Sequence, residues 1–364
     1  MDDKRTLFVI IPVYNGIRYL KEAVASVPSQ PYRNIRVCIV DDGSVDGTSE
    51  LCDALAANES SIHVIHKSNA GVSVARNTGI NWVLSIANLK LDYLAFCDAD
   101  DIWVPNAITN DFFDNCYGYD MYICNMLRST QNMDRFSIST SYKDEDITNT
   151  PSIFWEWDSF FFSHLYSCDL INRFHIRFSE LTNYVEDRMF DSVCIYLSQK
   201  IRRCSRYLYI YRYNSSSAMH TKKHLPPITY FLQIINGWIE TDNTINAWSK
   251  QTGKTSKMGY TLASIYFLDM AAEHYRHWGK QKQIEAALKS HPYYYLFTNM
   301  VEQDVSPNQY RNHLLMKNNP VAFRLKNYVI GIKLFMMECM FNLPFIKAIY
   351  FWKKYPLIDP PQNQ

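Results

Sequence analysis

The segment Asp92–Pro105, with the sequence DYLAFCDADDIWVP, carries the clearest indication of the fold. Within it, the apolar run Tyr93–Cys97 leads directly into the acidic stretch Asp98–Asp101. An apolar run that ends in acidic residues is typical of a buried strand whose carboxyl end reaches the rim of a parallel sheet. Open α/β sheets bind their ligands at these carboxyl ends. The segment therefore predicts a central strand with a ligand site at its end.

The pair formed by Asp98 and Asp100 has two interpretations. Carboxylates this close repel one another unless a cation or hydrogen bonds compensate. Ions such as Mg²⁺ take one or two protein carboxylates and complete their coordination with substrate phosphates and water, so the pair suits a divalent metal on a diphosphate. The alternative is a solvated acidic turn that caps a helix beginning near Pro105. These residues alone leave both interpretations open.

The chain before this segment alternates between strand and helix patterns. Continuous apolar runs of strand length occur at residues 6–12, 35–40 and 62–65. Helical patterns follow these runs at about residues 17–27, 46–57 and 72–87. This alternation predicts an α/β fold with a doubly wound, mostly parallel sheet. Polar residues follow three of the strands, at Tyr14-Asn15, Asp41-Asp42 and Asp98–Asp101, and we expect these strand ends to share one edge.

The next part of the chain contains both regular and irregular patterns. Residues 120–125 and 201–213 are expected to be strands, and a helix is expected to begin at Glu186-Asp187. The polar residues 128–152 show no periodicity and are expected to form a loop over the site or facing an acceptor, with residues 144–146 as a solvated acidic face. The aromatic segment 154–162 is expected in the core, with a wall for sugar stacking as the alternative.

The composition changes near residue 225, after which helical patterns dominate. We therefore expect a catalytic domain over residues 1–222 and a mainly helical region over 223–364. Residues 320–354 carry six Lys and Arg against one Glu, interleaved with aromatic side chains. Such a segment is suited to an anionic membrane surface, here the inner face of the cell membrane. The alternative is a helical subdomain that packs on the catalytic domain.

The composition argues against several classes of protein. The chain has 364 residues, of which 47% are apolar, enough for two domains or one large one. A net charge of +1 gives no basic field for nucleic acid. Nine scattered cysteines argue against a disulfide framework and for a reducing cytoplasm. The sequence has no signal-peptide pattern and no long uncharged apolar stretch, so we expect a cytoplasmic protein that is at most peripheral on the membrane.

Six short motifs follow one another along the chain: IPVYN at 11–15, VDDGS at 40–44, Asn69-x-Gly71, ARN at 75–77 with Gly79, DADD at 98–101, and EDRMF at 186–190. In this order and spacing they resemble the motifs of the family 2 glycosyltransferases, over about residues 5–215. The resemblance implies a GT-A fold and an inverting, hexosyltransferase-type enzyme that uses a nucleotide-diphosphate sugar, most often a UDP-sugar, with Mn²⁺ or Mg²⁺. The Gln-x-x-Arg-Trp motif of processive synthases is absent, which favours the addition of single sugars.

The resemblance also implies roles for individual residues on the donor side. Pro12 and Tyr14 would line the nucleobase and ribose pocket, and Asp42 would hydrogen bond to the base edge. Arg76 would support the nucleotide or its diphosphate. Asp98 would contact the ribose or the metal.

The remaining implied roles concern the metal and the proton transfer. Asp100 would ligate the metal on the diphosphate, with His220 as a candidate further ligand. Asp187 would be the catalytic base, with Glu186 as its neighbour or substitute. A positioned carboxylate can remove the proton of an attacking sugar hydroxyl, while a metal neutralises the charge on the departing diphosphate.

The expected reaction adds one sugar to a glycan acceptor, such as a lipid-linked oligosaccharide, in the assembly of a bacterial capsule, O-antigen or exopolysaccharide. Two alternatives remain. A sugar nucleotidyltransferase would need a Gly-rich phosphate loop, and neither GxxxxGK[ST] nor GxGxxG occurs. A non-catalytic protein that binds nucleotide sugars or glycans would not need Asp98, Asp100 and Asp187, all of which are present.

Overall fold

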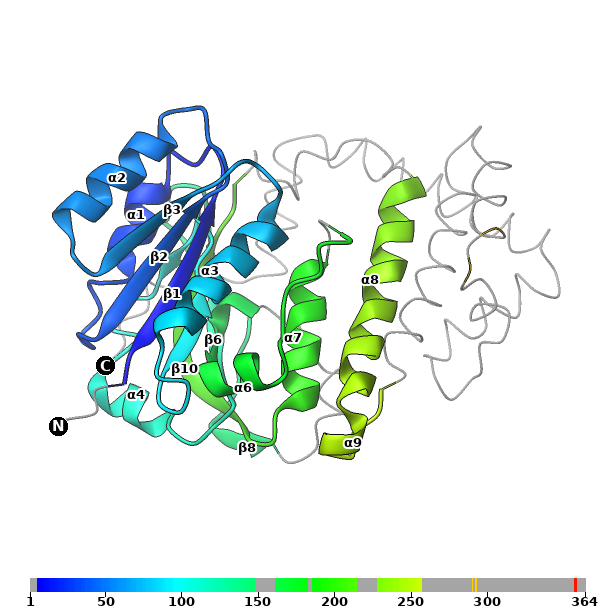
Figure 1. Ribbon diagram of the computed structural model, residues 1–364. Helices are drawn as coiled ribbons and strands as arrows, with labels where there is room; N and C mark the ends of the chain where they lie inside the picture. Colours follow the sequence, from blue (N-terminus) through cyan, green and yellow to red (C-terminus); the bar gives the residue numbers. More distant parts are fainter. Residues whose placement is uncertain are drawn as a thin grey trace, which may run out of the picture. The chain divides into compact units, whose positions relative to one another are not determined.

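The computed structural model describes residues 5–147, 161–182, 185–214 and 228–256, together with 290, 292, 357 and 358 (Figure 1). The chain divides into two compact units, one formed by residues 1–221 with 355–364 and the other by residues 222–354. The expected domain boundary between residues 222 and 223 stays a prediction. In the second unit, the described helices are α8 (Ile228–Ala247) and α9 (Ser249–Thr252).

One half of the sheet in the first unit is parallel. Its strands are β1 (Leu7–Val13), β2 (Ile35–Asp41), β3 (Ile62–His66) and β4 (Tyr93–Phe96). β1 lies between β2 and β4, and β3 lies beyond β2. All residues of β1 and β4 are buried, which explains why these strands are continuous apolar runs. The expected α/β fold with its parallel core is confirmed.

Three helices connect these parallel strands. They are α1 (Leu20–Ser26), α2 (Thr48–Asn58) and α3 (Val72–Ile86). α3 packs against β1 and β2 and crosses in front of them in Figure 1, whereas α2 packs against β2 and β3. α1 begins at Leu20 and not at Ile17 as expected, because residues 17–19 form a turn that leaves Ile17 47% exposed.

Beyond β4 the sheet becomes mixed. β9 (His164–Ser167) lies antiparallel between β4 and β6 (Met121–Ser129), and β10 (Ile201–Arg212) runs parallel to β6. Four short strands complete the sheet, namely β5 (Ile102–Trp103), β7 (Phe136–Ile138), β8 (Glu145–Ile147) and β11 (Leu357–Ile358). The expected strands at 120–125 and 201–213 are present as β6 and β10, whereas the short strands and β9 were not expected.

Within the described ranges, the helical segments of this mixed half are α4 (Asn110–Asn115), the 3₁₀ turn η1 (Phe161–Ser163), α6 (Cys168–Arg173) and α7 (Glu186–Leu197). α7 begins at Glu186, as expected from the sequence. Phe161 and Phe162 are buried, which agrees with the expected core role of the aromatic segment, whose residues 154–160 lie outside the described ranges. No helix within the described ranges is both long enough and apolar enough to cross a membrane.

One expectation for residues 128–152 needs correction, because the segment contains strands β7 and β8 and is not a single loop up to residue 147. The acidic residues 144–146 are exposed, as expected, and β8 pairs antiparallel with β10. Glu145 forms an ion pair with Arg203 at 2.9 Å, and Asp146 forms one with Arg202 at 2.8 Å. The arginines that pair with these acidic residues lie more than fifty positions away in the sequence, so the local sequence pattern could not indicate the ion pairs.

Gly79 is the position where α3 comes closest to the sheet. A methyl group at this position would lie 2.5 Å from Cγ2 of the fully buried Ile10 on β1. We expect Gly79→Ala to lower the free energy of unfolding by about 1–3 kcal/mol, as overpacked cores do, although alanine favours helices. Urea denaturation would measure the change. Ser85→Ala, at an exposed position of the same helix, is the control and should change the value by less than about 0.5 kcal/mol. Equal effects would contradict the close approach.

Candidate functional site

The polar ends of the parallel strands meet at one edge, as the sequence predicts. Val13 at the end of β1 pairs with Asp41 at the end of β2, and the amide of Asp42 donates to the Val13 carbonyl at 2.8 Å. A methyl group on Gly16 would lie 3.7 Å from Cβ of Ala99, so the turn after β1 also lies beside the acidic turn after β4. The edge therefore brings together three of the resembling motifs.

Arg76 on α3 links this edge to the start of α7. One guanidinium nitrogen donates to Asp98 Oδ1 and the other to Glu186 Oε1, each at 3.0 Å. The side chain of Arg76 is only 5% exposed. Its guanidinium lies 4.6 Å from the ring centre of Phe161 and 5.1 Å from that of Phe178. The two aromatic rings and the two carboxylates thus fix the position of a buried positive charge.

Asp187 lies at the first turn of α7, next to Glu186. Its Oδ1 accepts the backbone amide of Arg188 at 2.8 Å. Burial and the negative charge of Glu186 raise the pKa of Asp187 to about 7, although Arg76 opposes the shift. A carboxyl group with a pKa near neutrality can exchange a proton with a substrate at ordinary pH.

The residue before α7 has an unusual backbone conformation. Val185 has φ of 61°, in the left-handed region. A β-branched residue there is a genuine outlier, and such strain clusters at functional sites. Val185 directly precedes Glu186 and Asp187, so the strained residue fixes the direction in which α7 presents both carboxylates.

The acidic residues after β4 have different environments. Asp101 is 1% exposed, and its two oxygens accept the Tyr209 hydroxyl at 2.6 Å and the Arg212 amide at 2.7 Å. Burial raises the pKa of Asp101 well above its usual range. Asp101 therefore fixes the acidic turn to β10. Both of its carboxylate oxygens accept hydrogen bonds from β10.

Asp100 and Asp98 remain more accessible. Asp100 Oδ2 accepts the side-chain amide of Asn214 at 3.1 Å, and burial together with the charge of Asp98 raises the pKa of Asp100. The amide of Asp98 donates to the hydroxyl of Tyr209 at 3.0 Å. A cation beside these two carboxylates would relieve their repulsion. The described ranges contain no group of three or more His, Cys, Asp or Glu side chains placed to hold a metal ion.

Asp42 is 4% exposed at its side chain and contacts the loop that leads into α3. It accepts the Lys67 ammonium at 2.5 Å and the backbone amides of Ala70 and Gly71 at 3.0 and 2.8 Å. These bonds hold the loop against the end of β2. The contact of Asp42 with a nucleobase stays a prediction.

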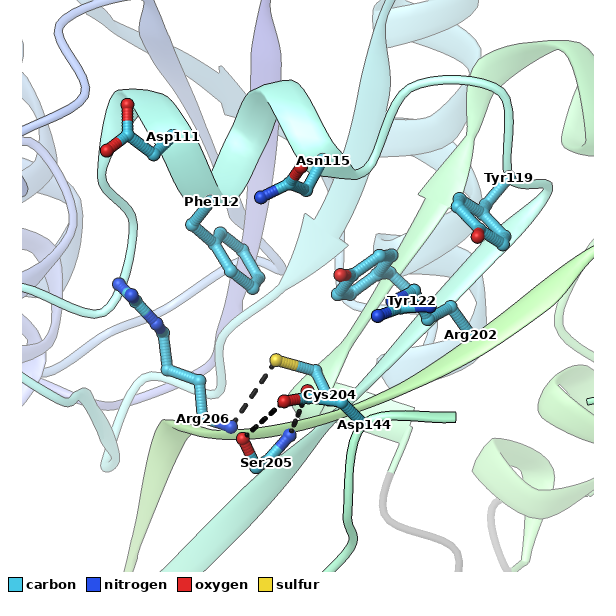
Figure 2. Close-up of a pocket in the computed structure, with 10 residues that line it drawn as sticks. All are labelled: Asp111, Phe112, Asn115, Tyr119, Tyr122, Asp144, Arg202, Cys204, Ser205 and Arg206. Atoms are coloured by element: carbon cyan, nitrogen blue, oxygen red, sulfur yellow. Dashed lines mark hydrogen bonds between the residues drawn. The ribbon is translucent and has the colours of Figure 1, made fainter. Parts of the chain in front are cut away.

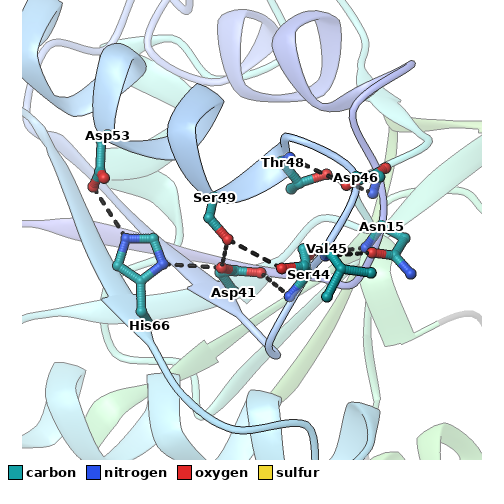
Figure 3. A network of polar contacts seen from close by, with 10 residues as sticks. Asn15, Asp41, Ser44, Val45, Asp46, Thr48, Ser49, Asp53 and His66 are labelled. Carbon is teal, nitrogen blue, oxygen red and sulfur yellow. Dashed lines mark hydrogen bonds and ion pairs between the residues drawn. The ribbon is translucent and has the colours of Figure 1, made fainter.

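The neighbouring Asp41 belongs to a separate polar network (Figure 3). Its Oδ2 lies 2.9 Å from His66 Nδ1, while His66 Nε2 lies 3.0 Å from Asp53. Hydrogen bonds to Asp53 and Asp41 raise the pKa of His66. The Asp41 oxygens also accept the hydroxyl of Ser49 and the amide of Ser44. This network fixes the end of β2, and thereby positions the adjacent Asp42.

The remaining predicted residues are placed as follows. Pro12 is buried within β1, and Tyr14 is 54% exposed beyond its end. Asn15 is held beside the VDDGS motif, since its amide donates to Ser44 Oγ and its side-chain oxygen accepts the Val45 amide, both at 2.9 Å (Figure 3). His220 lies outside the described residues.

Sequence reasoning missed the supporting residues from β10 and from the segment before α7. Tyr209, Arg212 and Asn214 hold the acidic turn. Asn77, next to Arg76, exchanges hydrogen bonds with the backbone of Phe178 at 2.8 and 3.0 Å. A strand pattern reveals neither its partner nor its register, so only the polar residues within β10 could have suggested these contacts.

Comparisons with known proteins identify the family. The family model described as Glycosyl transferase family 2 matches residues 8–171. Glycosyltransferase GlyG of Streptococcus pneumoniae is 30% identical over 234 residues, which cover 59% of this chain and 73% of GlyG. Glycosyltransferase GlyA of the same organism is 30% identical over 278 residues, but the match spans only 36% of GlyA. The chain belongs to the family 2 glycosyltransferases.

A solved structure supports the fold. The crystal structure of S. aureus TarS residues 1–349 in complex with UDP-GlcNAc has a TM-score of 0.62 and 17% sequence identity, with 92% of each chain covered. The GT-A type of α/β fold expected from the sequence is thus confirmed.

The raised pKa of Asp187 has a consequence for stability. Between the unfolded value of 3.8 and the folded value of about 7, the folded protein binds more protons than the unfolded chain. Its free energy of unfolding should therefore fall as the pH rises through this window. We expect Asp187→Asn, which cannot ionise, to gain about 1–3 kcal/mol relative to the wild type between pH 5 and pH 8, as measured by urea denaturation.

Asp111→Asn, at an exposed carboxylate of α4, is the matched control and should show no such trend. A difference between Asp187→Asn and the wild type that is independent of pH would contradict the raised pKa of Asp187.

Proposed function

We propose that this glycosyltransferase transfers one sugar from a UDP-sugar to a hydroxyl group of a glycan acceptor, with inversion at the anomeric carbon. The observation that carries the proposal is the Arg76 bridge, which links Asp98 at the strand-end edge to Glu186 beside Asp187. Asp98, proposed for the donor side, and Asp187, proposed for the proton transfer, thus lie on two sides of the buried guanidinium of Arg76. The TarS structure with bound UDP-GlcNAc supports a UDP-sugar as the donor.

Asp187 is the proposed catalytic base. As the acceptor oxygen forms its bond to the anomeric carbon, its proton passes to the Asp187 carboxylate. The bond from that carbon to the diphosphate oxygen breaks, and UDP leaves with the electron pair. The pKa of Asp187, about 7, matches this role because the group is then partly ionised yet basic enough to accept a proton. Glu186, held by Arg76, keeps the first turn of α7 in place.

Asp98 and Asp100 are the proposed protein ligands of a divalent cation, Mn²⁺ or Mg²⁺. The two carboxylates repel one another, as the raised pKa of Asp100 indicates, and a divalent cation would relieve this repulsion. Phosphate oxygens and water would take the remaining positions of the ion. When bound, the metal would neutralise charge on the leaving diphosphate. Pro12, Tyr14 and Asp42 are proposed for the nucleoside side of the donor. His220 is retained as a candidate further ligand.

The acceptor is proposed from the relatives and from the C-terminal sequence. The chain spans 36% of GlyA and 73% of GlyG, and both relatives are bacterial glycosyltransferases. A lipid-linked oligosaccharide of a bacterial surface polysaccharide fits both the family and the basic, aromatic residues 320–354. On this proposal the enzyme works at the inner face of the cell membrane.

The experiment compares donor binding with turnover in two variants. With UDP-GlcNAc and Mn²⁺, the wild type should melt at a higher temperature than without ligand, because a ligand specific for the native state stabilises it. Asp100→Asn should lose most of this metal-dependent shift. Asp187→Asn should keep the shift but release UDP at least about 100-fold more slowly, as expected for loss of a general base.

Glu50→Gln, at an exposed carboxylate of α2, is the control and should keep both properties. A wild type with no shift for any UDP-sugar would contradict the donor assignment. Equal UDP release by Asp187→Asn and the wild type would contradict the base assignment and favour a protein that only binds nucleotide sugars.

A further inference from the structure

A cavity lies in the first unit, away from the strand-end edge (Figure 2). It has a volume of about 490 Å³ and lies between α4, β6 and the beginning of β10. Ser205 lines it, whereas Asn214, beyond the other end of β10, contacts Asp100. Between them lies the stretch of β10 from Ser205 to Arg212, roughly 23 Å of extended strand. The cavity is therefore no part of the proposed donor site, although its volume is in the range of small-molecule sites.

Three aromatic side chains line the cavity, of which Phe112 and Tyr122 are buried (5% and 3% exposed) and Tyr119 is half-buried. Phe112 of α4 and Tyr122 of β6 meet edge to face with ring centres 5.4 Å apart, and Tyr119 follows at 5.9 Å from Tyr122. Figure 2 shows these rings along the cavity, with Asn115 above them. An aromatic ring offers a flat apolar surface of the kind that packs against the C–H face of a sugar ring.

The charged groups of the cavity balance one another. Arg202 is paired with Asp146 at 2.8 Å, and Arg206 donates to the Ala107 carbonyl at 3.1 Å and lies 5.3 Å from the ring centre of Phe112. Two aspartates, Asp111 and Asp144, also line the cavity. An anionic ligand would meet arginines that are already engaged and two like charges, which disfavours phosphates and nucleotides.

Helix α4, which carries Phe112, also offers hydrogen-bonding groups that are not engaged. In the part of the chain that the structure describes, the side chains of Asp111 and Asn115 make no hydrogen bond or ion pair, and both are exposed on α4. A carboxylate and an amide together supply acceptors and donors, which is the combination that neighbouring sugar hydroxyls require.

We propose that this cavity binds a neutral sugar unit of a glycan chain, as a subsite remote from the reaction centre. The half-buried Tyr119 would take the apolar face of the sugar, and Asp111 and Asn115 would bind its hydroxyls. The assignment rests on the proposed function in one respect only: the glycan is the acceptor or its product. A glycan that binds both this cavity and the strand-end edge would dissociate less readily than one that binds a single site.

The test is saturation-transfer NMR on the full chain with three neutral probes: methyl β-glucoside, methyl β-galactoside and methyl N-acetyl-β-glucosaminide. Their methyl group stands in for the rest of a glycan chain. At least one probe should bind, and saturating UDP with Mn²⁺ should leave its signal unchanged. Asn115→Ala and Tyr119→Ala should weaken binding about three- to tenfold, the effect of losing a hydrogen bond or a ring contact.

Tyr117→Ala is the matched control. Tyr117 is 56% exposed, lies two positions from Tyr119 and does not line the cavity, so its removal should leave probe binding unchanged. Asn115 is exposed, so Asn115→Ala remains informative if Tyr119→Ala fails to fold. The proposal is overturned if no neutral probe binds, if UDP displaces the probe, if Asn115→Ala binds like the wild type, or if glucose 6-phosphate alone binds.

A parallel thermal-shift measurement with UDP-GlcNAc and Mn²⁺ separates the two proposals. A wild type that responds to UDP-GlcNAc but binds no methyl glycoside would overturn the subsite and leave the proposed function intact. A wild type that binds a methyl glycoside with the expected variant effects, but ignores every UDP-sugar, would support the sugar site and overturn the donor assignment.

Discussion

The buried charge of Arg76 is the constraint on which the rest of the site depends. A guanidinium removed from water is costly unless carboxylates and hydrogen bonds compensate. Asp98 and Glu186 provide this compensation from two elements that lie 88 positions apart in the sequence. Because Arg76 needs both partners, the end of β4 and the start of α7 must come together in the folded state. The same pairing therefore serves stability and brings two of the resembling motifs to one place.

Several features around Arg76 follow from this constraint. Phe161 and Phe178 cover the faces of the guanidinium and exclude water from it, which strengthens its electrostatic interactions. Glu186 is ion-paired with Arg76 and lies beside Asp187. Burial and the negative charge of Glu186 raise the pKa of Asp187. The strained Val185 is tolerated where the helix must begin at a fixed position. Strain, burial and raised pKa thus occur together at the first turn of α7.

The parallel half of the fold could be predicted from the sequence because each strand there is one short run rich in apolar residues and a helical pattern separates each strand from the next. β1, β2 and α3 lie within one or two residues of their expected bounds. The mixed half could not be predicted to the same extent. β5 and β11 have two residues each, too few to show alternation, and their partners lie far away in the sequence.

The candidate site was predictable to a similar degree. The motifs made Asp98, Asp100 and Asp187 candidates for the site, which stay predictions, and the strand-end rule predicted the shared edge of Asp42 and Asp98. The motifs did not indicate that Asp101 accepts hydrogen bonds from Tyr209 and Arg212. The sequence does not distinguish an accessible aspartate at a strand end from a buried one. The motifs also did not indicate that Arg76 pairs with two protein carboxylates; its expected role toward the donor stays a prediction.

The most direct test of this account is a double-mutant cycle between Arg76→Gln and Glu186→Gln, measured as the free energy of unfolding in urea. If Arg76 joins the two elements as described, the two substitutions should be coupled by about 1–3 kcal/mol, because loss of either partner leaves the other buried and uncompensated. Effects that add to within about 0.5 kcal/mol would contradict the account, since independent sites behave in that way.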